Sequence, residues 1–425
     1  MPLRMIVFFA FITFLVFLVD LYGYKGIRML TENLDPLWRK ITRFAWWLPS
    51  IIWLGLAVYL FLNFTSIMAE KSYKFFYFVG GFGITFFVSK MVFLGFHFIE
   101  DLIQVGRWAV SKVYPSGGAD DFTPAKITRL QFLSQTGLIL SGVVFGSMVY
   151  GQIQGKYDFK VFREKLRFPK LPTGLRGMKI VQLSDMHLGS FLDNSFEEVK
   201  GAIAKVNELE PDYIFFTGDM VNNFAYETDA WIEIIGGLKA KKGKYSILGN
   251  HDYGDYVPWE TEEEKSKNLE DLYLAHQRMG FTLLRNENIV IQHKESSFNL
   301  IGVENWGQGF HQYGDLDKAM AGINSEDFNI LLSHDPTHWE KKVMDTAPIE
   351  LTLSGHTHGM QLGVEIPSLG IKISPARLRY KRWAGLYENE GRFLYVNRGF
   401  GYLGFPGRVG IKPEITLLEF DSELA

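Results

Sequence analysis

Four long apolar segments occupy the first 155 residues and constrain the fold more than any other feature of the chain. They cover residues 5–19, 44–64, 75–98 and 130–151. A helix of roughly 20 apolar residues spans a bilayer, and the second and fourth segments reach that length without a charged residue. The first and third reach it with help from their flanking residues. Because these segments lack the polar stripe of a helix that faces water, the sequence predicts an all-α bundle of four transmembrane helices.

Three residues or runs within these segments need an interpretation of their own. The first segment could be a signal peptide, but it ends in Asp20-Leu21-Tyr22 instead of a small-residue cleavage site, so we expect an uncleaved anchor. Lys90 lies in the third segment, and we expect its side chain to snorkel to the interface instead of serving in transport. His97 is expected to be interfacial as well.

The basic residues between the segments bear on topology. An even number of spans puts both termini on the same side. Nine Lys or Arg residues lie in the first and third loops and three at the N-terminus and in the second loop, which places the termini outside. Six more basic residues follow the fourth segment on the side with three, and counting them gives nine basic residues on each side. We therefore expect a multi-pass membrane protein, and extracytoplasmic is the favoured side for its C-terminal domain.

The remainder of the chain has a different character. Residues 1–155 carry a net charge of +5, whereas residues 156–425 carry −8 and nine of the ten histidines. We expect a transmembrane region over 1–151, a basic linker over 152–177 and a separate domain over 178–425. A whole-chain charge of −3 provides no basic field for nucleic acid. The absence of cysteine excludes disulfides, thiolate metal sites and a Cys nucleophile.

Short apolar strands alternate with helices from residue 179 onward, which predicts a layered α/β domain. Ligands of open α/β sheets bind at the carboxyl ends of the strands. The strands predicted over 179–184, 212–217, 244–248, 328–332 and 350–353 are each followed by Asp, Asn or His. The residues that arrive at this edge are Asp185, His187, Asp219, Asn250, His251, His334, His356 and His358.

This mixed nitrogen and oxygen donor set, without sulfur, suits Zn, Mn, Fe or Ni. Eight such residues exceed the needs of one ion, whereas two ions that share a carboxylate fit the count. Two metals clamp the attacking and leaving oxygens of a phosphoryl displacement and supply hydroxide at neutral pH. Residues two apart at an extended strand end point the same way, so both residues of Asp185-x-His187 can reach one metal, as can those of His356-x-His358. Glycines 218, 249 and 355 precede ligands where the backbone must approach the site closely.

Five motifs in chain order carry a resemblance to a known family: SDMHLG, TGDMV, GNHD, LSHDP and SGHTHG. Together they resemble the calcineurin-like metallophosphoesterase superfamily, and the N-terminal membrane segments are similar to its membrane-anchored bacterial branch. The resemblance covers about residues 178–421. It implies an α/β four-layer sandwich, in which two mixed β-sheets are flanked by helices.

The resemblance also implies two divalent metal ions and a role for each motif residue. The ligands divide into two sets bridged by Asp219: Asp185, His187 and His358 for one ion, and Asn250, His334 and His356 for the other. His251 would contact the phosphate and protonate the leaving oxygen, and Asn250 would help to bind the phosphate. The catalytic residues so implied are His251, Asn250 and Asp219.

The function implied by the resemblance is hydrolysis of a phosphate ester or pyrophosphate bond by a metal-bridging hydroxide. The membrane segments make the lipid bilayer the expected partner and favour a lipid-linked substrate, and some membrane-anchored members act on UDP-diacylglucosamine. No protein partner is evident. The alternatives are a non-catalytic metal- or phospholipid-binding or signalling module, and a transporter with an attached regulatory domain.

The chain departs from the family pattern after the bridging aspartate. Protein Ser/Thr phosphatases have Asp and then Arg at the positions of Asn222 and Asn223. This difference argues against a phosphoprotein phosphatase and leaves His251 without its usual orienting carboxylate. Either Asp252 or Asp335 is expected to substitute, or His251 is expected to be a weaker acid.

A basic segment, KISPARLRYKRW over 372–383, follows the last motif. It is either a solvated loop or a membrane- or phosphate-facing flap over the site. Arg398 and Arg408 are weaker candidates for phosphate binding. The histidines outside the motifs are expected to be surface or hydrogen-bonded residues: His276, His293, His311 and His338.

Overall fold

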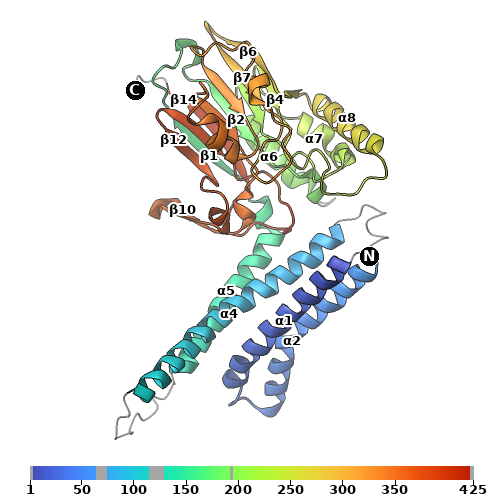
Figure 1. The fold of residues 1–425 in the computed structure, drawn as a ribbon, viewed down its shortest axis with the longest axis vertical. Coiled ribbons are helices and arrows are strands. Elements are labelled where there is room, and N and C mark those ends of the chain that lie inside the picture. The colour runs from blue at the N-terminus through green and yellow to red at the C-terminus, as the bar shows by residue number, and fades with distance from the viewer. Residues whose placement is uncertain (1–2, 64–73, 114–128, 192–194, 422–425) are drawn as a thin grey trace. The chain divides into compact units, whose positions relative to one another are not determined.

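The computed structural model describes residues 3–63, 74–113, 129–191 and 195–421. These residues form two compact units, Met1–Tyr150 and Gly151–Ala425, which are considered one at a time (Figure 1). The first unit contains long helices, and the second contains the strands. The division follows the change in composition that separates the two parts of the sequence.

The described part of the first unit contains four helices long and apolar enough to cross a membrane, as predicted. Each predicted segment falls on one of them. The first helix continues well past its apolar run, where Asp20 pairs with the buried Lys90 and Lys25 with the more exposed Asp101, both of α4. The helices are α1 (Leu3–Leu30), α2 (Pro36–Leu62), α4 (Lys74–Val113) and α5 (Arg129–Ile153).

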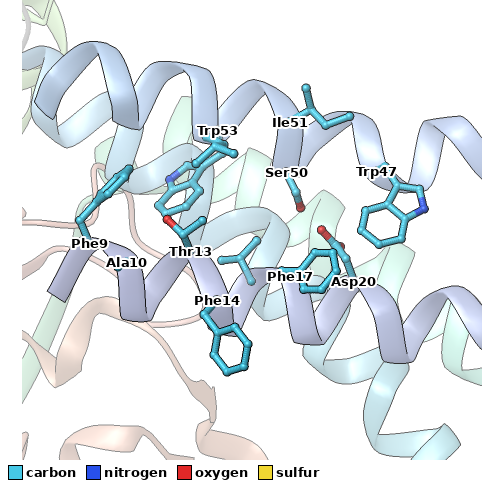
Figure 2. Close-up of a pocket in the computed structure, with 12 residues that line it drawn as sticks. Phe9, Ala10, Thr13, Phe14, Phe17, Asp20, Trp47, Ser50, Ile51 and Trp53 are labelled. Atoms are coloured by element: carbon cyan, nitrogen blue, oxygen red, sulfur yellow. The ribbon is translucent and has the colours of Figure 1, made fainter. Parts of the chain in front are cut away.

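A buried ion pair joins three of these helices. Lys90 of α4 contacts the Asp20 carboxylate of α1 and donates a hydrogen bond to Ser50 Oγ of α2 at 2.8 Å. Figure 2 shows Asp20 and Ser50 facing each other between apolar side chains that line a pocket of about 560 Å³. Lys90 is only 6% exposed, so the expectation that it snorkels is wrong. The bundle itself supplies the anion that this lysine pairs with.

The second unit is built on two six-stranded mixed sheets. In the first sheet β2 to β5 run parallel, while β14 runs antiparallel to β2. In the second, β7, β8, β9 and β13 run parallel between antiparallel edge strands. The first sheet has the order β1 (Lys160–Leu166), β14 (Glu414–Phe420), β2 (Lys179–Leu183), β3 (Tyr213–Phe216), β4 (Gly243–Ser246) and β5 (Thr282–Leu283). The second has the order β12 (Gly385–Asn389), β13 (Arg392–Val396), β9 (Leu351–Ser354), β8 (Asn329–Leu332), β7 (Ser296–Gly302) and β6 (Glu287–His293).

Successive side chains along each strand point to opposite faces of its sheet, and packing on both faces produces four layers. Tyr213 and Phe215 of β3 lie in the core between the two sheets, whereas Ile214 and Phe216 pack under helices on the outer face. Those helices are α6 (Phe196–Glu208), α7 (Ile232–Gly236) and α8 (Glu262–Arg278). A further core covers the outer face of the second sheet. It contains Ala319, the last residue of α9 (Leu316–Ala319), and Trp339, which follows α10 (Pro336–His338). The predicted four-layer sandwich is confirmed.

Several strands were not predicted from the sequence. Residues 152–177, predicted as a basic linker, contribute β1, which pairs in parallel with β14 from Lys160↔Glu414 to Leu166↔Phe420. Its three basic residues, Lys160, Arg163 and Lys165, are exposed and Leu166 is buried, as is typical of an edge strand with one face in water. Two further strands, β10 (Val364–Ile366) and β11 (Ile371–Ile373), form a separate hairpin.

The buried ion pair of the bundle leads to a stability prediction. Lys90→Met leaves the Asp20 carboxylate buried without its cation, and we expect a loss of about 3 kcal/mol or more in the free energy of unfolding. The matched control is the double variant Asp20→Leu/Lys90→Met, which removes both charges and should recover most of that loss. Unfolding of the full chain by detergent titration measures both. Equal stabilities for wild type and Lys90→Met would contradict the assignment.

Candidate metal centre

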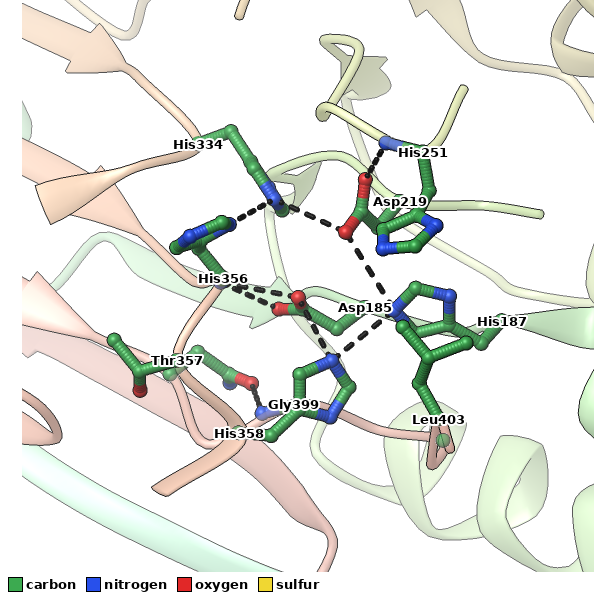
Figure 3. A network of polar contacts seen from close by, with 12 residues as sticks. Asp185, His187, Asp219, His251, His334, His356, Thr357, His358, Gly399 and Leu403 are labelled. Carbon is green, nitrogen blue, oxygen red and sulfur yellow. Dashed lines mark hydrogen bonds and ion pairs between the residues drawn. The ribbon is translucent and has the colours of Figure 1, made fainter. Parts of the chain in front are cut away.

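The predicted ligands of five strand ends converge at one edge of the sandwich. Asp185 and His187 follow β2, Asp219 follows β3, and Asn250 lies four residues after the end of β4. His334 follows β8, and His356 and His358 follow β9. Figure 3 shows the aspartates and imidazoles of this set turned toward one another. The structure therefore brings together every residue that the sequence places in the metal site.

Two groups of donor atoms can be distinguished within the described residues. Asp185, His187 and His358 form one cluster and Asp219, His334 and His356 the other, with the donor atoms of each cluster within 4.8 Å of one another. In the first, His358 Nε2 lies 3.1 Å from His187 Nε2 and 3.2 Å from Asp185 Oδ1. In the second, His356 Nδ1 lies 3.2 Å from His334 Nε2.

Asp219 and Asn250 complete the two groups. Asp219 Oδ2 lies 3.5 Å from His187 Nε2 and 3.2 Å from His334 Nε2, so one carboxylate oxygen faces both clusters. Asn250 Oδ1 lies 2.8 Å from His356 Nδ1 in the second cluster. Each cluster thereby presents two imidazole nitrogens and two oxygens. That donor set fits a divalent transition-metal ion, and the shared carboxylate fits a pair of ions.

Backbone carbonyls fix the direction in which two of the imidazoles point. His334 donates from Nδ1 to Thr217 O at 2.7 Å, which leaves Nε2 facing Asp219. His251 likewise donates from Nδ1 to Asn222 O at 2.9 Å. The orienting partner of His251 is therefore a carbonyl, and the expectation of Asp252 or Asp335 is wrong. A peptide oxygen at Asn222 takes the place of the missing carboxylate.

Two buried carboxylates shape the loop around Asp219. Asp252 accepts hydrogen bonds from the backbone N–H groups of Asp219, Met220, Val221 and Gly249. Glu227 accepts from those of residues 222 to 224. Burial raises the pKa of both Asp252 and Glu227 to about 7. These side chains hold the loop through backbone groups, which explains why Asp252 is not free to orient His251.

The ligand side chains are held on a strained backbone. Asp185, His187, Asp219, His356 and His358 all have positive φ, between 46° and 72°. Non-glycine residues rarely adopt this conformation, and each such residue costs on the order of 1–3 kcal/mol. Five of them at one edge indicate that the fold holds a geometry suited to the site at the expense of local stability.

Close backbone approach explains two of the motif glycines. A Cβ on Gly355 would lie 2.3 Å from Asp185 Oδ2, and one on Gly249 would lie 2.2 Å from Asp219 Oδ1. Either methyl group would push a ligand carboxylate aside. The expectation that these glycines allow close approach is confirmed.

The electrostatics of the site favour the metal-binding forms of Asp219, His187 and His356 but not that of His334. Burial acts to raise the pKa of Asp219, but the neighbouring imidazoles, His334 above all, hold it well below its ordinary value. Burial lowers the pKa of His187, His251 and His356, so their rings are neutral. For His334 the Asp219 carboxylate overcomes burial and raises the pKa to about 10. A cation that binds there displaces this proton.

Two tyrosines at the site were missed from the sequence. Tyr380 OH lies 2.9 Å from His356 Nε2, and Tyr256 OH accepts a hydrogen bond from Asn250 Nδ2 at 2.7 Å. Both come from irregular segments, where no spacing rule places a side chain. The Tyr380 hydroxyl orients His356 so that Nδ1 faces the cluster.

The other candidate residues have structural partners. Arg398 pairs with Glu365 and Glu414, and the buried Arg408 donates to backbone carbonyls of Gly399 and Gly401. These contacts leave neither guanidinium free for phosphate. As expected, the histidines outside the motifs are hydrogen-bonded, and their partners are Ser246 for His276, Tyr213 for His293, Asp255 for His311 and Ser333 for His338.

Comparison with protein families gives two separate matches. Residues 3–156 match the family described as "Probable Calcineurin-like phosphoesterase, transmembrane domain". Residues 178–360 match the family described as "Calcineurin-like phosphoesterase". The first match covers the four long helices, and the second covers all five motifs of the metal centre.

Three relatives illustrate the similarity. The metallophosphoesterase YkuE of Bacillus subtilis is 32% identical over 70% of this chain and 99% of its own length. A zebrafish transmembrane protein with metallophosphoesterase domain is 32% identical over 66% of this chain, which spans only 60% of that relative. The UDP-2,3-diacylglucosamine pyrophosphatase LpxG of Chlamydia trachomatis is 29% identical over 57% of this chain and 83% of its own length.

The contact between Gly355 and Asp185 leads to a prediction on metal affinity. Gly355→Ala places a methyl group against the Asp185 carboxylate, and we expect Mn²⁺ affinity, measured by isothermal titration calorimetry, to fall by about 10-fold or more. Gly201→Ala in α6 is the matched control, because a Cβ there meets nothing within 4 Å. Wild-type affinity in Gly355→Ala would show that the close approach does not position this ligand.

Proposed function

The chain belongs to the calcineurin-like metallophosphoesterase family, and from that premise we propose that it is a membrane-anchored hydrolase with a dinuclear metal centre that cleaves a pyrophosphate or phosphate ester bond in a lipid-linked substrate. The observation that carries this proposal is the position of Asp219, whose one carboxylate oxygen faces both donor clusters. A single metal site would not need a carboxylate in that position. The family match and the four long helices support the hydrolase and the membrane anchor.

We propose that the ligands divide as the two clusters do. Asp185, His187 and His358 hold one ion, Asn250, His334 and His356 hold the other, and Asp219 contacts both. Divalent ions bound there supply Lewis-acid charge for the phosphoryl oxygens and a hydroxide at neutral pH. The donor types admit Mn, Zn, Fe or Ni.

The residues of the chain contribute orientation and a proton. Asp219 accepts the backbone N–H of His251 at 2.8 Å, so the bridging residue also positions the next residue of the site. The hydrogen bond to Asn222 O leaves His251 Nε2 as the ring atom available to the substrate. We propose that this nitrogen contacts the phosphoryl group and that the negative charge of the bound phosphoryl group favours the imidazolium form of His251, which gives its Nε2 proton to the leaving oxygen. The Asn250 amide, oriented by Tyr256, assists in binding the phosphoryl group.

Location and similarity support the lipid-linked substrate. LpxG, a relative over 57% of this chain, is named for cleavage of a pyrophosphate bond in a diacylated sugar nucleotide. A catalytic domain that follows transmembrane helices is held near lipid, which raises the local concentration of a lipid substrate. We propose that residues 1–151 form the anchor and that the catalytic domain comprises residues 178–425 together with β1, on the extracytoplasmic side, with the lipid bilayer as partner.

Metal-dependent hydrolysis tests the proposal. The full chain, purified in detergent and loaded with Mn²⁺ or Zn²⁺, should hydrolyse bis-(p-nitrophenyl) phosphate or UDP-2,3-diacylglucosamine, and a chelator should abolish the activity. Asp219→Asn should lower kcat by about 100-fold or more, because it removes the charge that both clusters share. The exposed Asp229→Asn is the matched control.

Two outcomes would contradict the proposed function or mechanism. Metal bound at the centre together with no hydrolysis of a monoester, a diester or a lipid pyrophosphate would favour a non-catalytic binding or signalling module. Full activity in Asp219→Asn would remove the bridging carboxylate from the mechanism.

A further inference from the structure

The basic segment 372–383 is anchored to the domain near both ends, whereas residues 377–379 and 381 are exposed. Lys372 donates to Ala384 O, and Arg382 pairs with Glu340 at 2.9 Å and stacks on the Trp339 ring. Tyr380 and Trp383 are buried in a small core of their own. Two of the five basic residues of this segment therefore hold it in place.

Arg379 differs from these neighbours. Its side chain is exposed, and no carboxylate within the described ranges 3–63, 74–113, 129–191 and 195–421 pairs with it. Its guanidinium carbon lies 5.0 Å from the centre of the Phe310 ring and 5.4 Å from that of Tyr380. Two aromatic faces thus hold the cation without neutralising it.

The two rings that hold Arg379 also contact a metal-centre ligand. Phe310 packs edge-on against His356, with ring centres 4.8 Å apart, and Tyr380 OH lies 2.9 Å from His356 Nε2. Arg379 is therefore separated from His356 of the second donor cluster by a single aromatic side chain on each path.

We propose that Arg379 binds a second phosphoryl group of the substrate, next to the one that is hydrolysed, and so selects pyrophosphates over substrates with a single phosphoryl group. This inference rests on the proposed function of the same site and names the substrate class. A guanidinium is a planar donor that pairs with two phosphoryl oxygens at once, and it needs no proton transfer to do so. Aromatic stacking restricts its side chain, which reduces the entropy lost on binding.

The kinetic test compares two soluble substrates with one and two phosphoryl groups. The full chain in detergent, loaded with Mn²⁺, is assayed on bis-(p-nitrophenyl) phosphate and on a nucleoside-diphosphate sugar. Arg379→Gln should lower kcat/KM for the pyrophosphate by about 30-fold and for the single-phosphoryl ester by less than about 3-fold, and Arg379→Lys should fall between. Arg377→Gln, an exposed arginine two residues away, is the matched control and should match wild type. Equal losses on both substrates would overturn the proposal.

A binding measurement separates this proposal from the proposed function. Methylenediphosphonate and methylphosphonate, which resist hydrolysis, are titrated into the metal-loaded chain by calorimetry. Arg379→Gln should weaken methylenediphosphonate binding by about 10-fold and leave methylphosphonate within about 2-fold, whether or not the protein turns over any ester. If hydrolysis fails while this difference holds, the proposed function is wrong and the phosphoryl subsite stands. Equal effects on both ligands would overturn the subsite even in an active enzyme.

The same cation could instead contact the phosphate of a lipid headgroup. Flotation of the full chain in vesicles is not informative because its helices insert, so the assay uses the diphosphate sugar in phosphatidylcholine and in phosphatidylglycerol vesicles. A substrate subsite predicts the same loss for Arg379→Gln in both. A loss confined to the anionic vesicles would assign Arg379 to the membrane surface and overturn the proposal.

Discussion

The Asp219 carboxylate is the interaction on which the rest of the site depends. It is buried, it faces an imidazole of each cluster through one oxygen, and it accepts the backbone N–H of His251 through the other. An ionised carboxylate in this position is costly to remove from water unless cations compensate it. The surrounding imidazoles supply part of that compensation, and a pair of divalent ions would complete it.

The sandwich explains how one carboxylate can serve both clusters. Parallel strands of each sheet end at the same edge, so the loops after β2 and β3 meet those after β8 and β9 across the inter-sheet core. The apolar core holds the strands, and the strained residues at their ends take positions that the core imposes. Asp252, fixed by four backbone N–H groups, then holds the loop of Asp219 against the loop of Gly249. The rigid sheets therefore stabilise the strained backbone of the ligand residues at their edge.

The metal centre could be predicted from the sequence to a large extent, because its ligands follow buried strands at short fixed spacings. Asp185 and His187 are examples, because the spacing predicts that both reach one metal and they lie in one cluster. The same prediction is wrong for His356 and His358, which lie in different clusters, because the backbone there is left-handed and not extended. The orientation of His251 could not be predicted, because a backbone carbonyl has no signature in the sequence. Tyr380 and Arg379 were equally hidden within a basic run whose charges suggested a flap. Lys90 was misjudged because its partner Asp20 lies 70 residues away on another helix.

The number of metal ions per chain tests the central claim most directly. The full chain is loaded with Mn²⁺, freed of excess metal and measured by inductively coupled plasma mass spectrometry. The account predicts two ions in wild type, one in His358→Ala and one in His334→Ala, since each change removes a ligand from a different cluster. One ion in wild type, or two in both variants, would contradict a dinuclear centre built on Asp219.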